Sequence, residues 1–218
     1  MNPNYPSAVA VHRPNRATVD FFATLNPKPR VVAEIGCYQG HTSQALLSLM
    51  PDDGELHLYD FKGTAQAVAD RFDDQRIRVF GNSSLVLDSY NWSLMKVLAD
   101  HEEPIYDYVL IDGAHTWHHD ALAFLLVDRL LKRGGHVDFD DYQWTFRGSP
   151  SLNPNMFPKI ADWYTAEQID TAQVALVVDL LVRRDHLYVE VLRDRIFQKS
   201  ELPGFQKDRF EPDPPFKN

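Results

Sequence analysis

The chain has 218 residues, of which 44% are hydrophobic, and its formal net charge is -9 at pH 7. This composition is enough to build one α/β domain with a full core, and it argues against wholesale disorder. The acidic balance argues against nucleic acid as the main partner, because a phosphate backbone is bound by clustered Lys and Arg side chains. An acidic protein can still bind a small anionic ligand in a local pocket.

The cysteine content and the apolar runs bear on the compartment. Cys37 is the single cysteine, so the chain forms no internal disulfide, which fits a reducing environment. No apolar stretch approaches the length of a membrane span, and the first residues, MNPNYPSAVAVHRPN, lack the hydrophobic region of a signal peptide. We therefore expect a soluble, cytoplasmic protein without a membrane partner.

The predicted elements alternate in type along the chain. After a loose arm over residues 1–13, helix-start chemistry and apolar spacing predict a helix over residues 14–25. Short apolar runs then predict strands, and amphipathic runs between them predict helices. The strands are expected over residues 30–36, 55–60, 76–81, 105–112 and 136–141, and the helices over residues 41–50, 64–72, 85–100 and 119–132. Gly134-Gly135 is interpreted as the stop of the last of these helices and the turn after it.

The rhythm changes after the fifth strand. Residues 145–158 are expected to form a loop and residues 159–184 a helix, while residues 186–192 and 195–200 are candidates for a final strand pair. Strands separated by helices predict a doubly wound, Rossmann-like α/β fold. We expect a seven-stranded sheet, mostly parallel with an antiparallel final strand. The expected units are an N-terminal arm and helix, which form a candidate lid (1–29), the main domain (30–200) and a Pro-rich tail (201–218).

The first strand ends in a glycine loop, Glu34-Ile35-Gly36-Cys37-Tyr38-Gln39-Gly40, directly before a helix. Such a turn lets the backbone approach a ligand, and the helix N-terminus offers free N–H groups. A dinucleotide site requires a middle glycine to admit the pyrophosphate, but Tyr38 lies here, which disfavours NAD and FAD. S-adenosylmethionine has no pyrophosphate and does not need that glycine. Cys37, within the loop, is interpreted as a small packed residue rather than a nucleophile.

Residues after the second and third strands extend this pattern. Asp60 ends the second strand, where an acid can accept hydrogen bonds from both ribose hydroxyls of a nucleoside. Phe61 is a candidate cover for the adenine face, and Asn82-Ser83 are candidates for its edge. Asp60 alone does not separate NAD from S-adenosylmethionine.

Three acids follow the fourth and fifth strands. Asp112 ends the run YDYVLID, and Asp140-Asp141 end the run after Gly135. Neighbouring strands lie about 4.8 Å apart and ligands collect at their carboxyl ends, so the three carboxylates are expected to converge. Oxygen ligands of this kind suit a hard divalent cation. The alternative is that these acids are loop-start residues satisfied by backbone N–H groups. Asp138 interrupts an apolar strand, and we expect it to face a polar neighbour such as His136.

The motifs EIGCYQG, GNSS, IDGAHTWHHD and GGHVDFDDY, with the acid of LHLYD, resemble the class I S-adenosylmethionine-dependent methyltransferases. The resemblance covers about residues 30–145 and is greatest to metal-dependent O-methyltransferases that modify sugars, macrolides and cephalosporins. It implies S-adenosylmethionine as cofactor and a magnesium ion held by Asp112, Asp140 and Asp141. The predicted cofactor contacts are Glu34, Gly36, Tyr38, Gly40, Thr42, Ser43, Asp60, Phe61, Asn82, Ser83 and Asp112.

His115 is the best candidate for the general base, because a neutral imidazole accepts a proton near neutral pH. Together with Asp112 it forms the predicted catalytic pair. Some members of the resembled family carry an acid at the position of Ala114, so that second carboxylate base is missing here. His118 and His119 are interpreted as solvated residues of a first helical turn rather than zinc ligands. Trp117, Tyr142 and Trp144 are candidates either for an acceptor-binding wall or for ordinary packing.

The leading functional hypothesis is cation-assisted O-methylation of a small-molecule hydroxyl group. The alternatives are a metal-independent methyltransferase that uses His115 as its base, a non-catalytic cofactor-binding accessory protein, and an NAD-dependent oxidoreductase. The apolar stretch at residues 166–184 suggests either deep burial or a homodimer contact.

Overall fold

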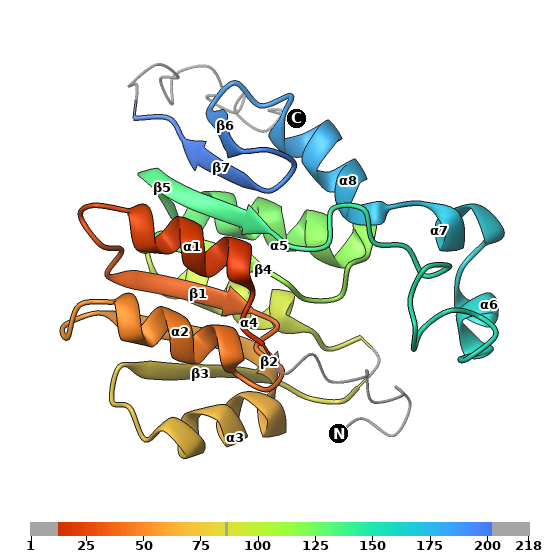
Figure 1. The fold of residues 1–218 in the computed structure, drawn as a ribbon, viewed down its shortest axis with the longest axis horizontal. Coiled ribbons are helices and arrows are strands. Elements are labelled where there is room, and N and C mark those ends of the chain that lie inside the picture. The colour runs from red at the N-terminus through yellow and green to blue at the C-terminus, as the bar shows by residue number, and fades with distance from the viewer. Residues whose placement is uncertain (1–12, 86, 202–218) are drawn as a thin grey trace, which may run out of the picture.

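The computed structural model describes residues 13–85 and 87–201. The expectations for residues 1–12, as part of a lid, and for residues 202–218, as a tail, lie outside the described residues. In the part that is described, helices flank a single seven-stranded sheet (Figure 1). The strands are β1 (Val31–Ile35), β2 (Glu55–Phe61), β3 (Ile77–Asn82), β4 (Tyr106–Ile111), β5 (Leu131–Phe139), β6 (Tyr188–Leu192) and β7 (Ile196–Lys199). The helices are α1 (Arg16–Thr24), α2 (His41–Leu49), α3 (Lys62–Phe72), α4 (Tyr90–Asp100), α5 (Trp117–Leu130), α6 (Lys159–Trp163), α7 (Ala166–Asp170), α8 (Gln173–Val177) and the π-helix η1 (Val178–Val182).

The strand order is β3-β2-β1-β4-β5-β7-β6. The first five strands are parallel, and β7 pairs antiparallel with both β5 and β6. This confirms the predicted Rossmann-like sheet with its antiparallel final strand. The order reverses between β1 and β4, which is the point where ligands bind in open α/β sheets.

Two cores lie on the two faces of the sheet, because successive residues of a strand point to opposite sides. In β4, for example, Tyr108 and Leu110 pack in one core, while Val109 and Ile111 pack in the other. The core that contains Tyr108 also contains Phe22 of α1, whose ring meets the Tyr108 ring edge-on at 5.2 Å. Helix α1 is therefore fixed to the sheet next to β4.

Some predicted boundaries differ from the structure, two of them by several residues. The helix expected from residue 85 begins only at Tyr90, because Ser89 is its N-cap and accepts a hydrogen bond from the Asn91 N–H. Gly134 and Gly135 lie inside β5 rather than in a turn, since α5 ends at Leu130 and Leu131 already pairs with Tyr106.

The long helix predicted over residues 159–184 is broken into α6, α7, α8 and η1. The breaks have local causes, because Tyr164 and Thr171 have extended backbone and Thr165 starts α7 with a capping box that includes Gln168. The segment that carries α6 and α7 lies beyond the carboxyl ends of the parallel strands (Figure 1). It has a small core of its own around Phe146, Ile160 and Ile169. No helix among the described residues is long and apolar enough to cross a membrane.

Candidate active site

The loop after β1 is built directly against the end of β4. Gly36 has a φ of +90°, and a Cβ at this position would lie 1.9 Å from the carbonyl oxygen of Asp112. The Gly36 N–H donates to the Tyr59 carbonyl, and the Asp112 N–H donates to the Ile35 carbonyl at 2.8 Å. A side chain at residue 36 would therefore separate the glycine loop from Asp112, and glycine is the residue that allows this close approach.

Asp60 closes the loop from the side of β2. One oxygen of its carboxylate accepts a hydrogen bond from the Tyr38 N–H at 2.9 Å, and the other accepts one from the Phe61 N–H at 2.6 Å. Burial raises the pKa of Asp60, although these backbone donors act in the opposite direction. Tyr38 itself has a φ of +42° and is half-exposed. The ribose-binding role of Asp60 stays a prediction, and its position next to the loop is compatible with it.

The loop leads into helix α2 through Gly40, which is the N-cap residue with a φ of +70°. In the first turn of α2, Ser43 is buried and donates a hydrogen bond of 2.5 Å to the carboxylate of Glu34. Burial raises the pKa of Glu34 to about 8, with the Ser43 hydrogen bond acting against it. Thr42 accepts a hydrogen bond from the Asn15 N–H at 2.9 Å, so it links α2 to the start of α1.

The residues predicted to contact adenine lie around one small cavity. Phe61, Asn82 and Ser83 all line a space of about 360 Å³ at the ends of β2 and β3. Asn82 is buried and donates to the Ser83 carbonyl, while Asp88 accepts from the Ser83 N–H at 2.7 Å. These contacts hold the two residues at the cavity wall. The structure therefore brings the predicted adenine-binding residues together.

An acidic cluster lies at the ends of β4 and β5. Asp112, His115 and Asp141 each place a potential ligand atom within 4.8 Å of the other two. Nε2 of His115 lies 3.4 Å from Asp141 and 3.9 Å from Asp112. Within the described residues neither of these two carboxylates accepts a hydrogen bond. Burial, followed by the charges of Asp140 and Asp141, raises the pKa of Asp112 well above its usual range.

Asp140 lies close enough for its charge to act on Asp112, but its carboxylate already has partners. Its two carboxylate oxygens accept hydrogen bonds of 2.7 Å from Arg195 and from Asn15, so it is not part of the cluster around His115. Burial acts to raise the pKa of Asp140, but the Arg195 guanidinium outweighs it and holds the pKa below the usual range. Among the residues that the structure describes, Asp112 and Asp141 thus receive no hydrogen bond, whereas Asp140 is already paired; its role as a metal ligand stays a prediction.

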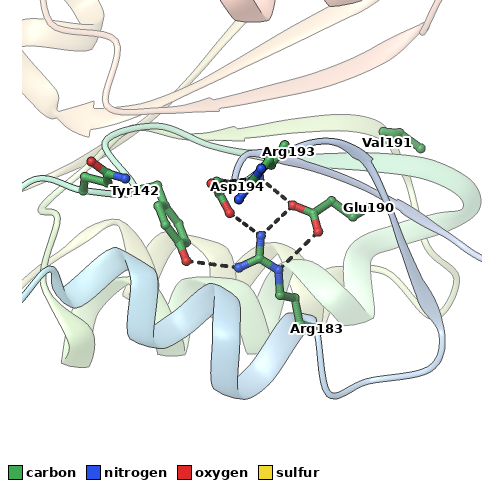
Figure 2. A pocket seen from close by; sticks show the side chains of 7 residues that line it. Tyr142, Arg183, Glu190, Val191, Arg193 and Asp194 are labelled. Carbon is green, nitrogen blue, oxygen red and sulfur yellow. Dashed lines mark hydrogen bonds and ion pairs between the residues drawn. The ribbon is translucent and has the colours of Figure 1, made fainter.

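Of the three aromatic residues proposed as an acceptor-binding wall, one lies at the acidic cluster and two lie elsewhere. The Trp144 ring lies 5.3 Å from the His115 ring and meets Phe146 edge-on, so it forms one wall of the cluster. Tyr142 instead points toward Arg183, in a surface depression between η1 and the β6–β7 hairpin (Figure 2). Trp117 is partly exposed at the start of α5, where Gln173 accepts from its backbone N–H. Of the three, Trp144 is in contact with a predicted catalytic residue.

His118 and His119 lie in the first turn of α5, and only His118 is solvated as expected. His118 is exposed and contacts the Tyr164 ring, whereas His119 is partly buried, lies 2.9 Å from the Thr116 hydroxyl, and has its pKa lowered to about 4 by burial. Neither belongs to the cluster around Asp112. Cys37 is buried, and burial raises the pKa of its thiol, so it is a packed residue and not an activated nucleophile.

Sequence reasoning missed Asn15, Thr18 and Arg195. Asp138, expected to face His136, accepts hydrogen bonds of 2.7 Å from Thr18 and from Tyr108, and its other oxygen lies 2.9 Å from Arg195. The one signal in the sequence was the presence of Asp138 in an apolar strand, because a buried carboxylate requires partners. Nothing in the pattern indicated which distant residues supply them.

The sequence profile of a methyltransferase domain family matches residues 33–142, about half of the chain. The chain belongs to this methyltransferase family. The matched region begins in β1 and ends just after Asp141, so it contains the glycine loop, Asp60 and the acidic cluster. The methyltransferase has the class I S-adenosylmethionine-dependent fold. No protein with a curated description matches its sequence significantly.

Several solved structures share the fold of this methyltransferase. An O-methyltransferase from Bacillus cereus in complex with SAH has 14% identity and a TM-score of 0.59, and the match covers 88% of this chain and 84% of that one. TomG from Streptomyces achromogenes, an O-methyltransferase of tomaymycin synthesis in complex with SAM, has 16% identity and a TM-score of 0.56, with 84% and 80% covered. A putative caffeoyl-CoA O-methyltransferase from Staphylococcus aureus has 16% identity and a TM-score of 0.56, with 85% and 84% covered. At these identities the likeness concerns the fold alone.

Proposed function

We propose that this methyltransferase transfers a methyl group from S-adenosylmethionine to a hydroxyl oxygen of a small molecule, assisted by a divalent cation. The observation that carries the proposal is the contact between the two halves of the site. The space that a Gly36 side chain would fill is taken by the backbone of Asp112, so the cofactor loop and the acidic cluster are direct neighbours. The O-methyltransferase relatives that were solved with SAM or SAH support the same assignment.

The residues of the acidic cluster fit a cation. Asp112 and Asp141 lie beside each other at the carboxyl edge of the sheet, and neither accepts a hydrogen bond within the described residues. Two such carboxylates in a partly buried site repel each other unless a positive charge lies between them. We propose Asp112 and Asp141 as the primary ligands of a magnesium ion, with Asp140 nearby. When bound, the cation would lower the pKa of the acceptor hydroxyl and orient its oxygen.

The chain's own residues supply binding, orientation and proton transfer. The N–H groups at the start of α2, together with Glu34, would hold the amino-acid part of the cofactor, and Asp60 would hold its ribose. Phe61, Asn82 and Ser83 would enclose the adenine. His115 lies between the two acids and would accept the acceptor's proton at Nε2, while Trp144 keeps the imidazole in place. Residues 30–200 would form the catalytic domain, and the segment from Trp144 to Trp163 would contribute to acceptor selection.

The test uses purified full-length protein, methyl-labelled S-adenosylmethionine and a panel of catechols, sugars and macrolide hydroxyls. We expect label transfer that is lost in EDTA and restored by Mg²⁺ or Mn²⁺. Full activity in the chelator would contradict the role of the cation while leaving methyl transfer intact. Tight SAH binding without transfer to any acceptor would contradict the enzymatic assignment and favour the accessory-protein hypothesis.

One observation favours metal-independent transfer as a second candidate. The 3.4 Å distance between His115 and Asp141 already forms a carboxylate–imidazole pair, which can accept a proton without a cation. This mechanism predicts that His115→Gln abolishes turnover, that added Mg²⁺ changes nothing, and that the protein binds no Mn²⁺ near Asp141. Mn²⁺ binding that is lost in Asp141→Asn would exclude it.

A further inference from the structure

Arg195 is the last residue of the β6–β7 turn, directly before β7, and its side chain extends toward the acidic end of β5. Its side chain is only 16% exposed. One terminal nitrogen donates to Asp140 at 2.7 Å, the other donates to the Thr18 hydroxyl at 2.8 Å, and Nε lies 2.9 Å from Asp138. The guanidinium therefore bridges β5 and α1, which are far apart in the sequence.

Asp138, the partner of Arg195 inside the sheet, accepts hydrogen bonds from two hydroxyl groups. Asp138 is fully buried in the middle of the sheet and receives the hydroxyl groups of Thr18 and Tyr108, both at 2.7 Å. Thr18 thus accepts from Arg195 and donates to Asp138. A carboxylate in such a position is tolerated because charged and hydroxyl partners surround it.

Asp140, the second acidic partner of Arg195, is linked through Asn15 to α2, the helix after the cofactor loop. Asn15 donates to the second oxygen of Asp140 at 2.7 Å, and its own side-chain oxygen caps α1 by accepting from the Thr18 N–H. The Asn15 backbone N–H donates to Thr42 in the first turn of α2. A continuous chain of polar contacts therefore runs from Arg195 through Asp140 and Asn15 to the helix that follows the glycine loop.

A second arginine from the same region provides a contrast. Arg183 follows η1 and pairs with Glu190 and Asp194 and with the Tyr142 hydroxyl (Figure 2). Arg183 also pairs with Asp179 of η1. It also fixes the β6–β7 hairpin, but it pairs with none of the acids at the ends of β4 and β5. The two arginines therefore differ in the groups that they hold: Arg183 pairs within and around the hairpin, whereas Arg195 pairs with the acidic end of β5 and with α1.

We infer that Arg195 is a positioning residue of the active site, which holds Asp140 and the start of α1 in register with the cofactor loop and the Asp112–Asp141 pair. This inference rests on the proposed function. The planar guanidinium is suited to this task, because its two terminal nitrogens donate to Asp140 and Thr18 in different directions while its charge lies beside Asp138. A lysine would keep the charge but offer one compact ammonium group. A residue placed in this way affects turnover through the geometry of the reacting oxygen, and contributes little to cofactor affinity.

The test compares Arg195→Met and Arg195→Lys with the matched control Arg183→Met in the full-length protein. The readouts are kcat and KM for an acceptor from the screen, SAH affinity by calorimetry, and hydrogen exchange of α1. For Arg195→Met we expect kcat to fall about 10- to 100-fold and exchange of α1 to rise, while the Kd for SAH stays within about threefold. Arg195→Lys should recover part of the lost kcat, and Arg183→Met should change neither kcat nor α1 exchange.

The inference is overturned if Arg195→Met retains wild-type kcat and α1 protection, or if Arg183→Met reproduces its effects, because the role would then be general support of the hairpin. If Arg195→Met does not fold, Arg195→Lys carries the same comparison, with a smaller fall in kcat and a smaller rise in α1 exchange. If the wild-type protein transfers no methyl group, the proposed function fails, whereas α1 exchange still decides whether Arg195 holds this helix.

Discussion

Replacing Gly36 with alanine tests the contact between the cofactor loop and Asp112. The new Cβ would lie 1.9 Å from the Asp112 carbonyl oxygen, whereas real Cβ atoms essentially never approach closer than 3.0 Å, so the two backbones must separate by about 1 Å. The positive φ of residue 36 adds about 1–2 kcal/mol for any residue with a side chain. We expect a total loss of about 3 kcal/mol in the free energy of unfolding.

The assay for Gly36→Ala combines urea denaturation with calorimetry of SAH binding. Affinity for SAH should fall at least about tenfold, because the loop that would contact the cofactor is displaced. Gly63→Ala is the matched control for stability but not for SAH affinity, because Gly63 lines the cavity beside Asn82. A Cβ there meets nothing within 4 Å, and the residue lies in α3, where alanine is favoured over glycine by up to about 1 kcal/mol. A Gly36→Ala protein with wild-type stability and SAH affinity would refute this reasoning.

Three further predictions concern single side chains. Asp60→Ala should weaken SAH binding by about 1–3 kcal/mol in calorimetry, whereas Asp70→Ala, on the exposed side of α3, should leave it unchanged. Electron paramagnetic resonance should show that Asp141→Asn reduces Mn²⁺ affinity at least about 100-fold. Asp140→Asn should reduce it by less than about tenfold, because Arg195 and Asn15 already occupy the oxygens of Asp140. Equal losses in the two variants would contradict the assignment. The Glu34 carboxyl has its pKa raised from 4.5 to about 8 in the folded protein, so its contribution to stability decreases as the pH rises from about 4.5 to about 8. Relative to the wild type, Glu34→Gln should therefore gain on the order of 3 kcal/mol between pH 5 and pH 8 in denaturation experiments.

Much of the fold could be predicted because the alternation of apolar strands and amphipathic helices repeats through the first five strands. The last third was less predictable. Residues 159–184 have a helical composition, but the Thr165 cap and the extended residues Tyr164 and Thr171 divide them into short pieces. Gly134-Gly135 has the composition of a turn, yet the pairing of Leu131 with Tyr106 extends the strand backward through both glycines. In both cases a local signal was outweighed by capping or by strand pairing.

In the candidate site, too, local sequence predicted some side-chain positions and not others. The convergence of Asp112 and Asp141 follows from strand ends at one edge of a parallel sheet, and the structure places them together with His115. The pairing of Asp140 with Arg195 joins residues 55 positions apart. Since Arg195 comes from the turn before the antiparallel strand β7, its partner depends on the whole topology and not on any local motif.

The most direct measurement of the central claim is a crystal structure with SAH and Mn²⁺, recorded with anomalous diffraction at the manganese edge. We expect SAH to lie along Gly36, Asp60 and the cavity beside Asn82, and one anomalous peak within bonding distance of the Asp112 and Asp141 carboxylates. SAH bound away from the glycine loop, or the absence of a manganese peak between these two acids, would contradict the account.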